Sequence, residues 1–169
     1  MKLSFIKYTM VEWIFQVSLL DKKDLALLRY LQQDGRVSSL KLSQDLDVSP
    51  ASAWRRLKRL EDEAFIEGYQ AVVNRRKVGF GVMAFVRLVC SQHSEAATRD
   101  FEDRINANPY VLSCHNITGE ADFLLQVVAR DLDHYSLFIE KELRKLPGIL
   151  SINSSISLRE VKKTHPLPV

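Results

Sequence analysis

The sequence is poor in cysteine. Its two cysteines, Cys90 and Cys114, stand far apart and form no C-x-x-C pair. This scarcity argues against a disulfide framework or a thiolate zinc site, and it is compatible with the reducing cytoplasm, where we expect the protein to reside. His93 and His115 lie near these cysteines. Four ligands at a recognisable spacing are missing, so we expect no metal ion and no other cofactor.

The sequence also lacks the side-chain groupings that catalysis requires. Two close acidic pairs, Asp21/Asp24 and Glu140/Glu142, are accompanied by neither a nucleophile nor a base. Asp21 and Asp24 suit the start of a helix instead. We therefore expect a protein that is not an enzyme.

No long unbroken apolar run is present. Residues 1–17 are apolar and aromatic, but Glu12 interrupts them and no small-residue cleavage site follows, which argues against a signal peptide. The stretch is also too short and too polar to span a membrane. Residues 1–19 are therefore predicted to be an N-terminal extension that packs on the body. The alternative is a start codon placed too far upstream, since Met10 offers another.

Charge of one sign is not in large excess, because 24 basic and 21 acidic residues give a net charge of +3. The composition, 46% hydrophobic and 27% charged, is that of an ordinary folded protein. The distribution is more informative, since residues 49–60 hold four basic side chains and no acidic one. Residues 75–77 form a second basic cluster. A local basic stripe on a nearly neutral chain indicates a localised anionic partner.

Three helix signals follow one another between residues 20 and 64. Asp21 is predicted to cap the first helix, whose apolar positions are Leu25, Leu28 and Leu31, with Leu27 beside them. Asp34-Gly35 ends it. Ser38 caps a short second helix, the turn Asp47-Val48 follows, and Ser49 caps a third helix with Pro50 at its first position.

The third helix carries the basic stripe. A buried stripe is predicted for Ala53, Leu57, Leu60 and Ala64. The opposite face is predicted to hold Ala51, Ser52, Arg55 and Arg59, flanked by Arg56 and Lys58. A short helix, a tight turn and a basic third helix are typical of a helix-turn-helix. Residues 65–73 are predicted to form a short strand pair, or wing, so that residues 20–73 make a DNA-binding domain and residues 74–81 a basic linker.

The second half, residues 82–169, alternates strand and helix signals. Strands are predicted at 82–90, 110–118, 123–129 and 149–158, with helices between the first two and the last two. This βαββαβ order is the ferredoxin-like arrangement, four antiparallel strands with two helices on one face. The fold class is therefore α+β. The other sheet face is apolar and uncovered, so a second copy of the chain is the simplest cover.

Taken together, these segments make the sequence resemble the Lrp/AsnC family, the leucine-responsive and asparagine-responsive regulators, from about residue 20 onward. The residues that carry the resemblance are Leu20-Asp21-Lys22-Lys23-Asp24, Leu31-Gln32-Gln33-Asp34-Gly35-Arg36, Val48-Ser49-Pro50, Arg56-Leu57-Lys58-Arg59-Leu60-Glu61, Ile66-Glu67-Gly68-Tyr69, Thr118-Gly119-Glu120-Ala121-Asp122-Phe123-Leu124-Leu125, Leu146-Pro147-Gly148-Ile149, Val161-Lys162-Lys163-Thr164 and Leu167-Pro168. Their order and spacing make the set specific.

The resemblance implies dimers that assemble further, often to octamers, and an amino-acid-type effector held near the turn 119–122 between dimers. Three features depart from the family. Ala64 stands where a glycine usually ends the recognition helix, so this helix is expected to end differently. Ser43 replaces a packed alanine, and the apolar segment before Leu20 is unusually long.

The DNA-contacting residues are predicted at the start of the third helix. Ser52 and Arg55 are the candidates for base contacts in the major groove, and Ala51 for contact with a thymine methyl group. The predicted phosphate or flanking contacts are Arg56, Lys58 and Arg59. Ser38, Ser49 and the basic residues of the linker are predicted as weaker contacts. For Trp54, partial burial and DNA contact are both open. Pairing of two such helices predicts a roughly palindromic operator.

The predicted effector site is the turn formed by Thr118, Gly119, Glu120 and Asp122. Gly119 lets a ligand approach the backbone closely, and Asp122 can pair with an α-ammonium group. Because the turn is acidic, backbone amides or a neighbouring subunit would have to receive the α-carboxylate, and this need for a second contributor places the ligand between subunits. A Gly-x-x-Asp sequence between two strands is also ordinary turn chemistry, so a purely structural turn stays an alternative.

The prediction is thus a sequence-specific transcription regulator that binds double-stranded DNA as a homodimer or higher oligomer and responds to a small effector. The main alternative is an amino-acid-binding sensor module that acts through protein partners without DNA. A weaker alternative is an enzyme on the ferredoxin-like fold. RNA binding is disfavoured, because residues 77–81 resemble an RNA-binding signature but the third strand carries no pair of stacking side chains.

Overall fold

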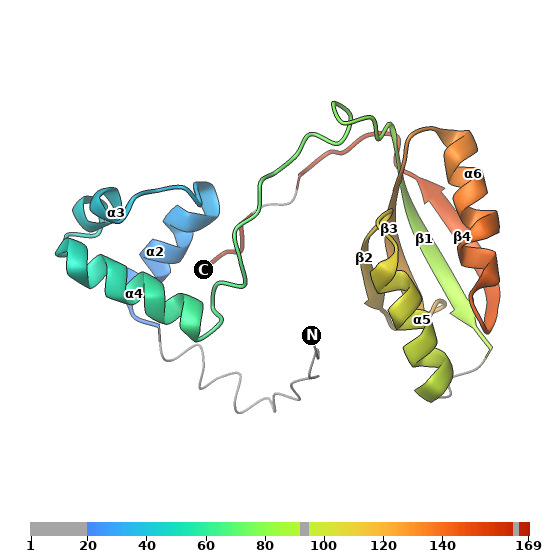
Figure 1. Cartoon of the computed structure of the whole chain (residues 1–169), viewed down its shortest axis with the longest axis horizontal. Helices are drawn as coiled ribbons and strands as arrows, with labels where there is room; N and C mark the ends of the chain where they lie inside the picture. Colours follow the sequence, from blue (N-terminus) through green and yellow to red (C-terminus); the bar gives the residue numbers. More distant parts are fainter. Residues whose placement is uncertain (1–19, 92–94, 164–165) are drawn as a thin grey trace. The chain divides into compact units, whose positions relative to one another are not determined.

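The computed structural model describes residues 20–91, 95–163 and 166–169, which form two compact units (Figure 1). The first unit takes in the chain up to Ala71 together with Lys162–Val169, and the second takes in Val72–Val161. The expected N-terminal extension and His93 lie outside the described residues. The division at Ala71 falls close to the expected boundary at residue 73. The return of Lys162–Val169 to the first unit was not expected from the sequence.

The first unit contains three helices, α2 (Lys22–Gln33), α3 (Ser39–Asp45) and α4 (Pro50–Asp62). All three predicted N-caps are confirmed. Asp21 accepts hydrogen bonds from the backbone of Lys23 and Asp24, Ser38 from Lys41 and Ser49 from Ser52. Each cap satisfies backbone N–H groups that have no partner inside the helix, and this fixes where the helix begins.

A small core holds these helices together. Its buried members are Leu27, Leu42, Leu46, Ala53 and Leu60. In α2 the predicted stripe of Leu25, Leu28 and Leu31 is only half-buried, and Leu27 is the leucine that is fully enclosed. The helical period alone placed that stripe one position away from the true centre of the buried face.

The end of α4 corrects the expectation for Ala64. This residue adopts a left-handed backbone with φ 58°, as a glycine would, although it carries a Cβ. Ala64 is also exposed, so it is not part of the predicted buried stripe. The Ile66 N–H donates to the Leu60 carbonyl at 3.1 Å. Packing of the partly buried Phe65 and Ile66 against the core accounts for this sharp turn despite the steric cost of the left-handed conformation.

Ala64→Gly is therefore expected to stabilise the first unit by about 0.5–1 kcal/mol. The substitution removes a left-handed penalty of about 1–2 kcal/mol, partly offset by the greater freedom of glycine in the unfolded chain. Denaturant unfolding of the full chain measures the change. Ala71→Gly is the control, because Ala71 is exposed and has no positive φ, and we expect it to be neutral or slightly destabilising. A loss of stability in Ala64→Gly would contradict this account.

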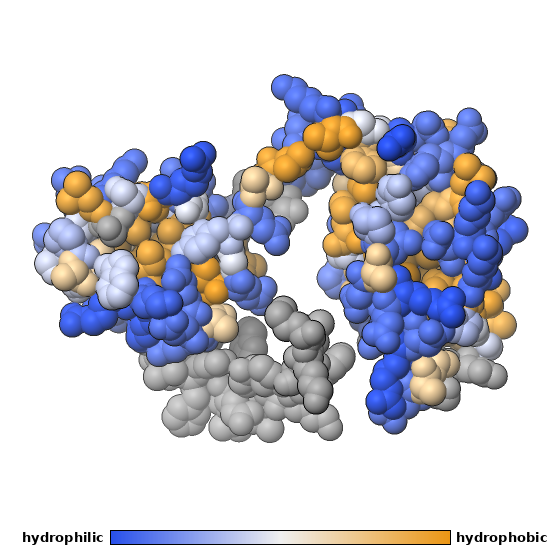
Figure 2. Space-filling model, viewed as in Figure 1, coloured by the Kyte–Doolittle hydropathy of each residue, from blue (hydrophilic) through white to orange (hydrophobic). Residues whose placement is uncertain are grey.

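The predicted strand pair, or wing, over residues 65–73 is not formed within this chain. These residues contain no strand and leave the first unit as an irregular segment. Tyr69 ties its start to the helices, because its hydroxyl donates to Glu61 at 3.0 Å and its ring lies against Gly35. Burial, reinforced by the Glu61 carboxylate, raises the pKa of Tyr69 to about 12. Further along, Val72 and Val73 are exposed and pair with no strand among the described residues. Figure 2 shows hydrophobic residues, in orange, at the surface along the segment that leaves the first unit.

The second unit is the predicted ferredoxin-like domain. Its elements are β1 (Val82–Cys90), α5 (Glu95–Ala107), β2 (Val111–Asn116), β3 (Phe123–Ala129), α6 (Leu132–Lys141), a 3-10 turn (Leu143–Lys145) and β4 (Ile149–Ile156). The strands pair antiparallel in the order β2-β3-β1-β4. The βαββαβ prediction is confirmed, although β2 and β4 are shorter than predicted.

The two helices cover one face of this sheet. The enclosed core consists of Ala84, Val86, Leu88, Phe101, Ile105, Leu125, Val127, Ala129, Tyr135, Phe138, Leu143 and Leu146. The alternate side chains of β1 point to the other face. There, opposite partners on β1 and β3 are Met83 and Val128, Phe85 and Gln126, and Arg87 and Leu124. This open face is mixed rather than apolar throughout, and its Phe85 side chain is exposed.

Candidate nucleic-acid interface and ligand domain

The N-terminal half of α4 presents an accessible surface. Ser49 and Pro50 begin the helix, and the side chains of Ala51, Trp54 and Arg55 are exposed, with Ser52 half-buried. Trp54 is 59% exposed, so partial burial does not account for it. Small residues at the first turn and an exposed aromatic and cationic pair on the next are chemically suited to approach the floor of a DNA groove.

The four basic residues of α4 are not equivalent. Arg55 makes no ion pair or hydrogen bond with the described residues. Lys58 is exposed and pairs along the helix with Asp62 at 2.9 Å, and this carboxylate raises the pKa of the lysine. Such a surface pair contributes little stability and exchanges readily for another anion. Arg55 and Lys58 are therefore available to DNA.

Arg56 and Arg59 turn inward to α2. Arg56 Nη1 lies 2.7 Å from Asp24 Oδ1 and 2.7 Å from Asp21 Oδ2, and Arg59 Nη2 lies 2.6 Å from Asp24 Oδ2. The helical period placed Arg59 opposite the buried stripe, but its long side chain reaches back to the acidic end of α2. Both guanidinium groups therefore already have carboxylate partners within the first unit. Their predicted phosphate contacts remain predictions.

Asp24 is the centre of this cluster, and its contact with two arginines of α4 was not expected from the sequence. It is 1% exposed, and its carboxylate also accepts the Asp21 N–H at 3.0 Å, which completes a reciprocal capping box. The Asp24 N–H and the Arg56 guanidinium both lower the pKa of the Asp21 carboxyl, and the two carboxylates raise the pKa of Arg56. The cluster fastens α4 to the start of α2. The sequence signal was two arginines three residues apart beside the buried stripe.

One of the basic residues of the linker, Arg75, already binds backbone groups of the linker. Arg75 Nη1 donates to the carbonyl oxygens of Phe80 at 2.9 Å and Gly81 at 3.1 Å, which closes the turn formed by residues 74–80. Arg76 and Lys77 are exposed. Arg76 and Lys77 are therefore the linker residues that stay candidates for the predicted weak phosphate contacts, whereas Arg75 stabilises the turn.

The predicted effector turn lies between β2 and β3. Thr118, Gly119 and Glu120 are exposed, and Gly119 has φ 115°, which a residue with a side chain rarely adopts. Asp122 bridges the turn to β1, since its Oδ2 accepts the Cys90 N–H at 2.7 Å and its own N–H donates to Leu88 at 2.9 Å. Burial and the Asp122 charge raise the pKa of the Cys90 thiol. Asp122 therefore has a structural role at the irregular end of β1.

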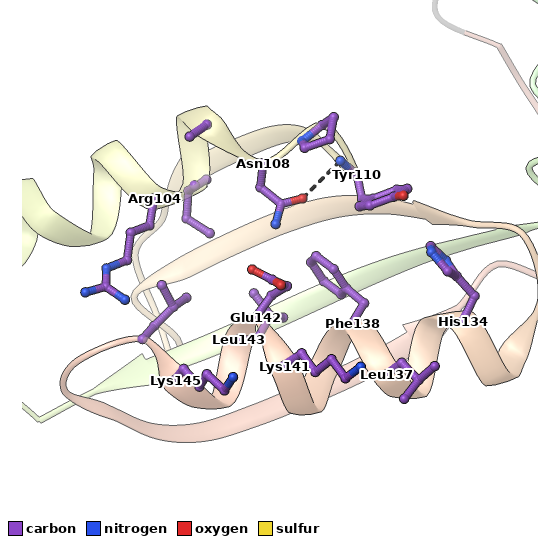
Figure 3. A pocket seen from close by; sticks show the side chains of 14 residues that line it. Arg104, Asn108, Tyr110, His134, Leu137, Phe138, Lys141, Glu142, Leu143 and Lys145 are labelled. Atoms are coloured by element: carbon purple, nitrogen blue, oxygen red, sulfur yellow. Dashed lines mark hydrogen bonds between the residues drawn. The ribbon is translucent and has the colours of Figure 1, made fainter.

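A groove of about 770 Å³ lies elsewhere, between α5 and α6 (Figure 3). Ile105, Phe138 and Leu143 are among its apolar lining, and the rim carries Lys141 and Lys145. None of the predicted effector residues lines it. Sequence reasoning missed this groove, whose one signal was an apolar side chain, Leu137, between the buried positions of α6.

The described residues offer neither a cluster of metal ligands nor a membrane-spanning helix. Among them, no group of three or more histidine, cysteine, aspartate or glutamate side chains is placed to hold a metal ion. No helix of the described chain is long and apolar enough to cross a membrane.

Two protein-family models match the chain. A winged helix-turn-helix DNA-binding model matches residues 20–67, and a model of the Lrp/AsnC ligand binding domain matches residues 83–167. With the exposed basic helix α4 and the ferredoxin-like second unit, these matches define a DNA-binding transcriptional regulator that carries a ligand-binding domain. The chain belongs to the Lrp/AsnC family.

Similar proteins agree with this assignment. The chain is 37% identical over 142 residues to the Bkd operon transcriptional regulator of Pseudomonas aeruginosa, which covers 84% of this chain and 93% of the relative. It is 33% identical over 151 residues to the DNA-binding transcriptional activator DecR of Escherichia coli, covering 89% and 99%. The relatives are regulators and not enzymes, as the sequence predicted.

A solved structure extends the similarity to both units. A transcriptional regulator of Neisseria meningitidis, solved as a complex with L-Met, is 37% identical and superposes with a TM-score of 0.84, covering 88% of this chain and 96% of that chain. Escherichia coli AsnC, at 19% identity and a TM-score of 0.78, shares the fold.

Proposed function

We propose that this regulator binds a roughly palindromic operator as a cytoplasmic homo-oligomer and that an amino acid controls this binding. The observation that carries the DNA contact is the exposed first half of α4. Arg55 is accessible there and makes no ion pair with the described residues, while Ala51 and Ser52 leave room for base edges. Lys58 supplies a phosphate contact, and Arg56 and Arg59 supply further ones when they release Asp24. Ser38 and Ser49, which cap the starts of α3 and α4, are the weaker phosphate contacts.

The open sheet face of the second unit supports the homodimer. Phe85 is exposed at the middle of β1, next to the half-buried Leu124, and a two-fold copy of the same face would cover both. Arg87 and Gln126 on this face provide polar pairing across such an interface. Further assembly, up to an octamer, would then bring the turns at residues 118–122 of neighbouring dimers together.

Phe85→Glu is expected to shift the protein from dimer to monomer, because it places a charge at the centre of the covered face. Sedimentation equilibrium at micromolar concentration measures the change. Leu132→Glu is the matched control, since Leu132 is exposed on α6, on the helical side of the domain. A dimer that persists in Phe85→Glu, or a monomeric parent protein, would contradict the proposed interface.

The proposed effector is an amino acid bound at the turn containing Gly119 and Asp122. The Neisseria relative was solved with L-Met, which makes methionine the first ligand to test. The turn offers the backbone of Gly119 and the exposed Thr118 and Glu120. Asp122 would meet an α-ammonium group while it holds the Cys90 N–H, because a carboxylate has several acceptor sites. A neighbouring subunit would receive the α-carboxylate.

Asp122→Asn is expected to weaken effector binding about tenfold or more, because the charge that pairs with the α-ammonium group is lost. The asparagine oxygen can still accept the Cys90 N–H, so the fold should survive, which Asp122→Ala does not ensure. Calorimetric titration with L-Met, L-Leu and other amino acids measures the loss. Asp133→Asn, an exposed change on α6, should titrate like the parent. A full response in Asp122→Asn would reduce Asp122 to a turn residue.

A further inference from the structure

The outer face of α2 holds the last residues of the sequence. We propose that this face is a docking surface for residues 166–169, and that docking gives the DNA-binding unit a second connection to the rest of the chain. The contact itself stands on the geometry of the first unit. Its consequence for DNA rests on the proposed function.

The main contact is made by the Gln32 side chain, which binds both backbone polar groups of Leu167. Gln32 Nε2 donates to the Leu167 carbonyl at 3.2 Å, and Gln32 Oε1 accepts the Leu167 N–H at 2.5 Å. One helical turn earlier, Arg29 Nε donates to the Val169 oxygen. An amide that satisfies both backbone groups of one residue reproduces the pairing of a neighbouring β-strand.

The docked segment is preorganised. Pro166 and Pro168 flank Leu167, and proline has a fixed φ and no N–H. Leu167 therefore carries the one backbone N–H of the three, and Gln32 takes it. The Val169 N–H folds back to the Leu167 carbonyl at 2.9 Å, which closes a tight turn around Pro168. A stiff extended segment loses little conformational entropy when it docks.

The docking face is separate from the DNA-contacting helix. Asp24 and Leu27 mark the buried side of α2, where Asp24 binds the arginines of α4. Arg29 and Gln32 are three positions apart and exposed on the opposite side of the helix. Docking of residues 166–169 therefore leaves the exposed face of α4 free for DNA.

The topological consequence is a closed loop of chain. Residues Val72–Val161 form the second unit, and the residues that follow them, Lys162–Val169, belong to the first unit again. A unit attached at two points samples fewer orientations than a unit on a single flexible linker. In a dimer, this restriction would narrow the half-site spacings that two α4 helices can reach together.

Controlled proteolysis tests the contact without DNA. Trypsin cleavage after the exposed Lys163 releases residues 164–169, and its rate reports how often the segment is undocked. Gln32→Ala is expected to accelerate the release about fivefold or more, since both bonds to Leu167 are lost. Leu167→Pro removes the backbone N–H that Gln32 accepts and replaces a side chain that is 71% exposed, so it should act in the same direction. Gln33→Ala, the neighbouring exposed glutamine, is the matched control and should cleave like the parent.

The second measurement compares operators in which two half-sites are set at different spacings, using the same variants in the full chain. Gln32→Ala is expected to flatten the dependence of affinity on spacing, with binding to a single half-site unchanged. Equal cleavage of Gln32→Ala, Gln33→Ala and parent would overturn the docking. Faster cleavage with an unchanged spacing dependence would overturn the role as a second connection. Failure of every variant and the parent to bind DNA would refute the proposed function instead, and the cleavage rates would still decide the docking.

Discussion

Asp24→Ala is expected to destabilise the DNA-binding unit by about 2–4 kcal/mol, the largest stability effect of any substitution considered. Asp24 is buried, and it accepts hydrogen bonds from Arg56, Arg59 and the Asp21 N–H. Removing the carboxylate leaves Arg56 with Asp21, and Arg59 with the more distant Glu63 at 3.9 Å, as their remaining acidic partners. The arginines are partly exposed to water, which keeps the loss below that of a fully enclosed pair.

Hydrogen exchange of the α4 amides measures this loss within the first unit, and DNA affinity should fall with it. Glu67→Ala is the control, because Glu67 is an exposed acid for which no ion pair is found among the described residues. A double-mutant cycle of Asp24→Ala with Arg59→Ala should give a coupling of about 1 kcal/mol or more. Unchanged exchange in Asp24→Ala would show that the cluster does not hold α4.

Arg55→Ala is expected to lower specific DNA affinity by about 1–3 kcal/mol and to relax preference at one operator position. Arg55 is exposed at the second turn of α4 and has no intramolecular ion partner among the described residues, so its guanidinium donors are available for a bidentate base contact. The test is a gel-shift titration against operators with single base changes.

Lys58→Ala separates base reading from charge. It should weaken all sequences about equally and reduce the slope of log affinity against log salt by about 0.9, as expected for one lost phosphate contact. Arg99→Ala, an exposed cation on α5 in the second unit, removes the same charge and should change neither quantity. If Arg55→Ala and Lys58→Ala both bind like the parent, this face of α4 does not read DNA.

Two findings argue against the alternative of an amino-acid-binding sensor module that does not bind DNA. The basic third helix is part of a unit that matches a DNA-binding family model, and relatives across the full domain arrangement are transcriptional regulators. The operator, the effector and the oligomer of this protein can each be tested by a separate substitution. The proposed variants at Arg55, Asp122 and Phe85 address these separately.

The sequence by itself determined the elements and their order. Asp21, Ser38 and Ser49 marked the helix starts correctly, because a cap is a local bond between a side chain and backbone groups two or three residues away. The strands of the second unit were located by alternation along β1 and by the turn at residues 119–122 for the same local reason. The βαββαβ order then left little choice of topology.

Tertiary structure decided what long side chains and special backbone conformations do. The inward reach of Arg56 and Arg59 depends on Asp24, more than thirty residues away in the chain, which no helical period encodes. Ala64 keeps a left-handed turn because the following residues pack on a core. Asp122 is committed to Cys90 across the sheet. Residues 166–169 join the first unit through Gln32, a contact that is local only in space. Sequence patterns report neighbours along the chain, whereas these interactions exist only once the chain has folded back on itself.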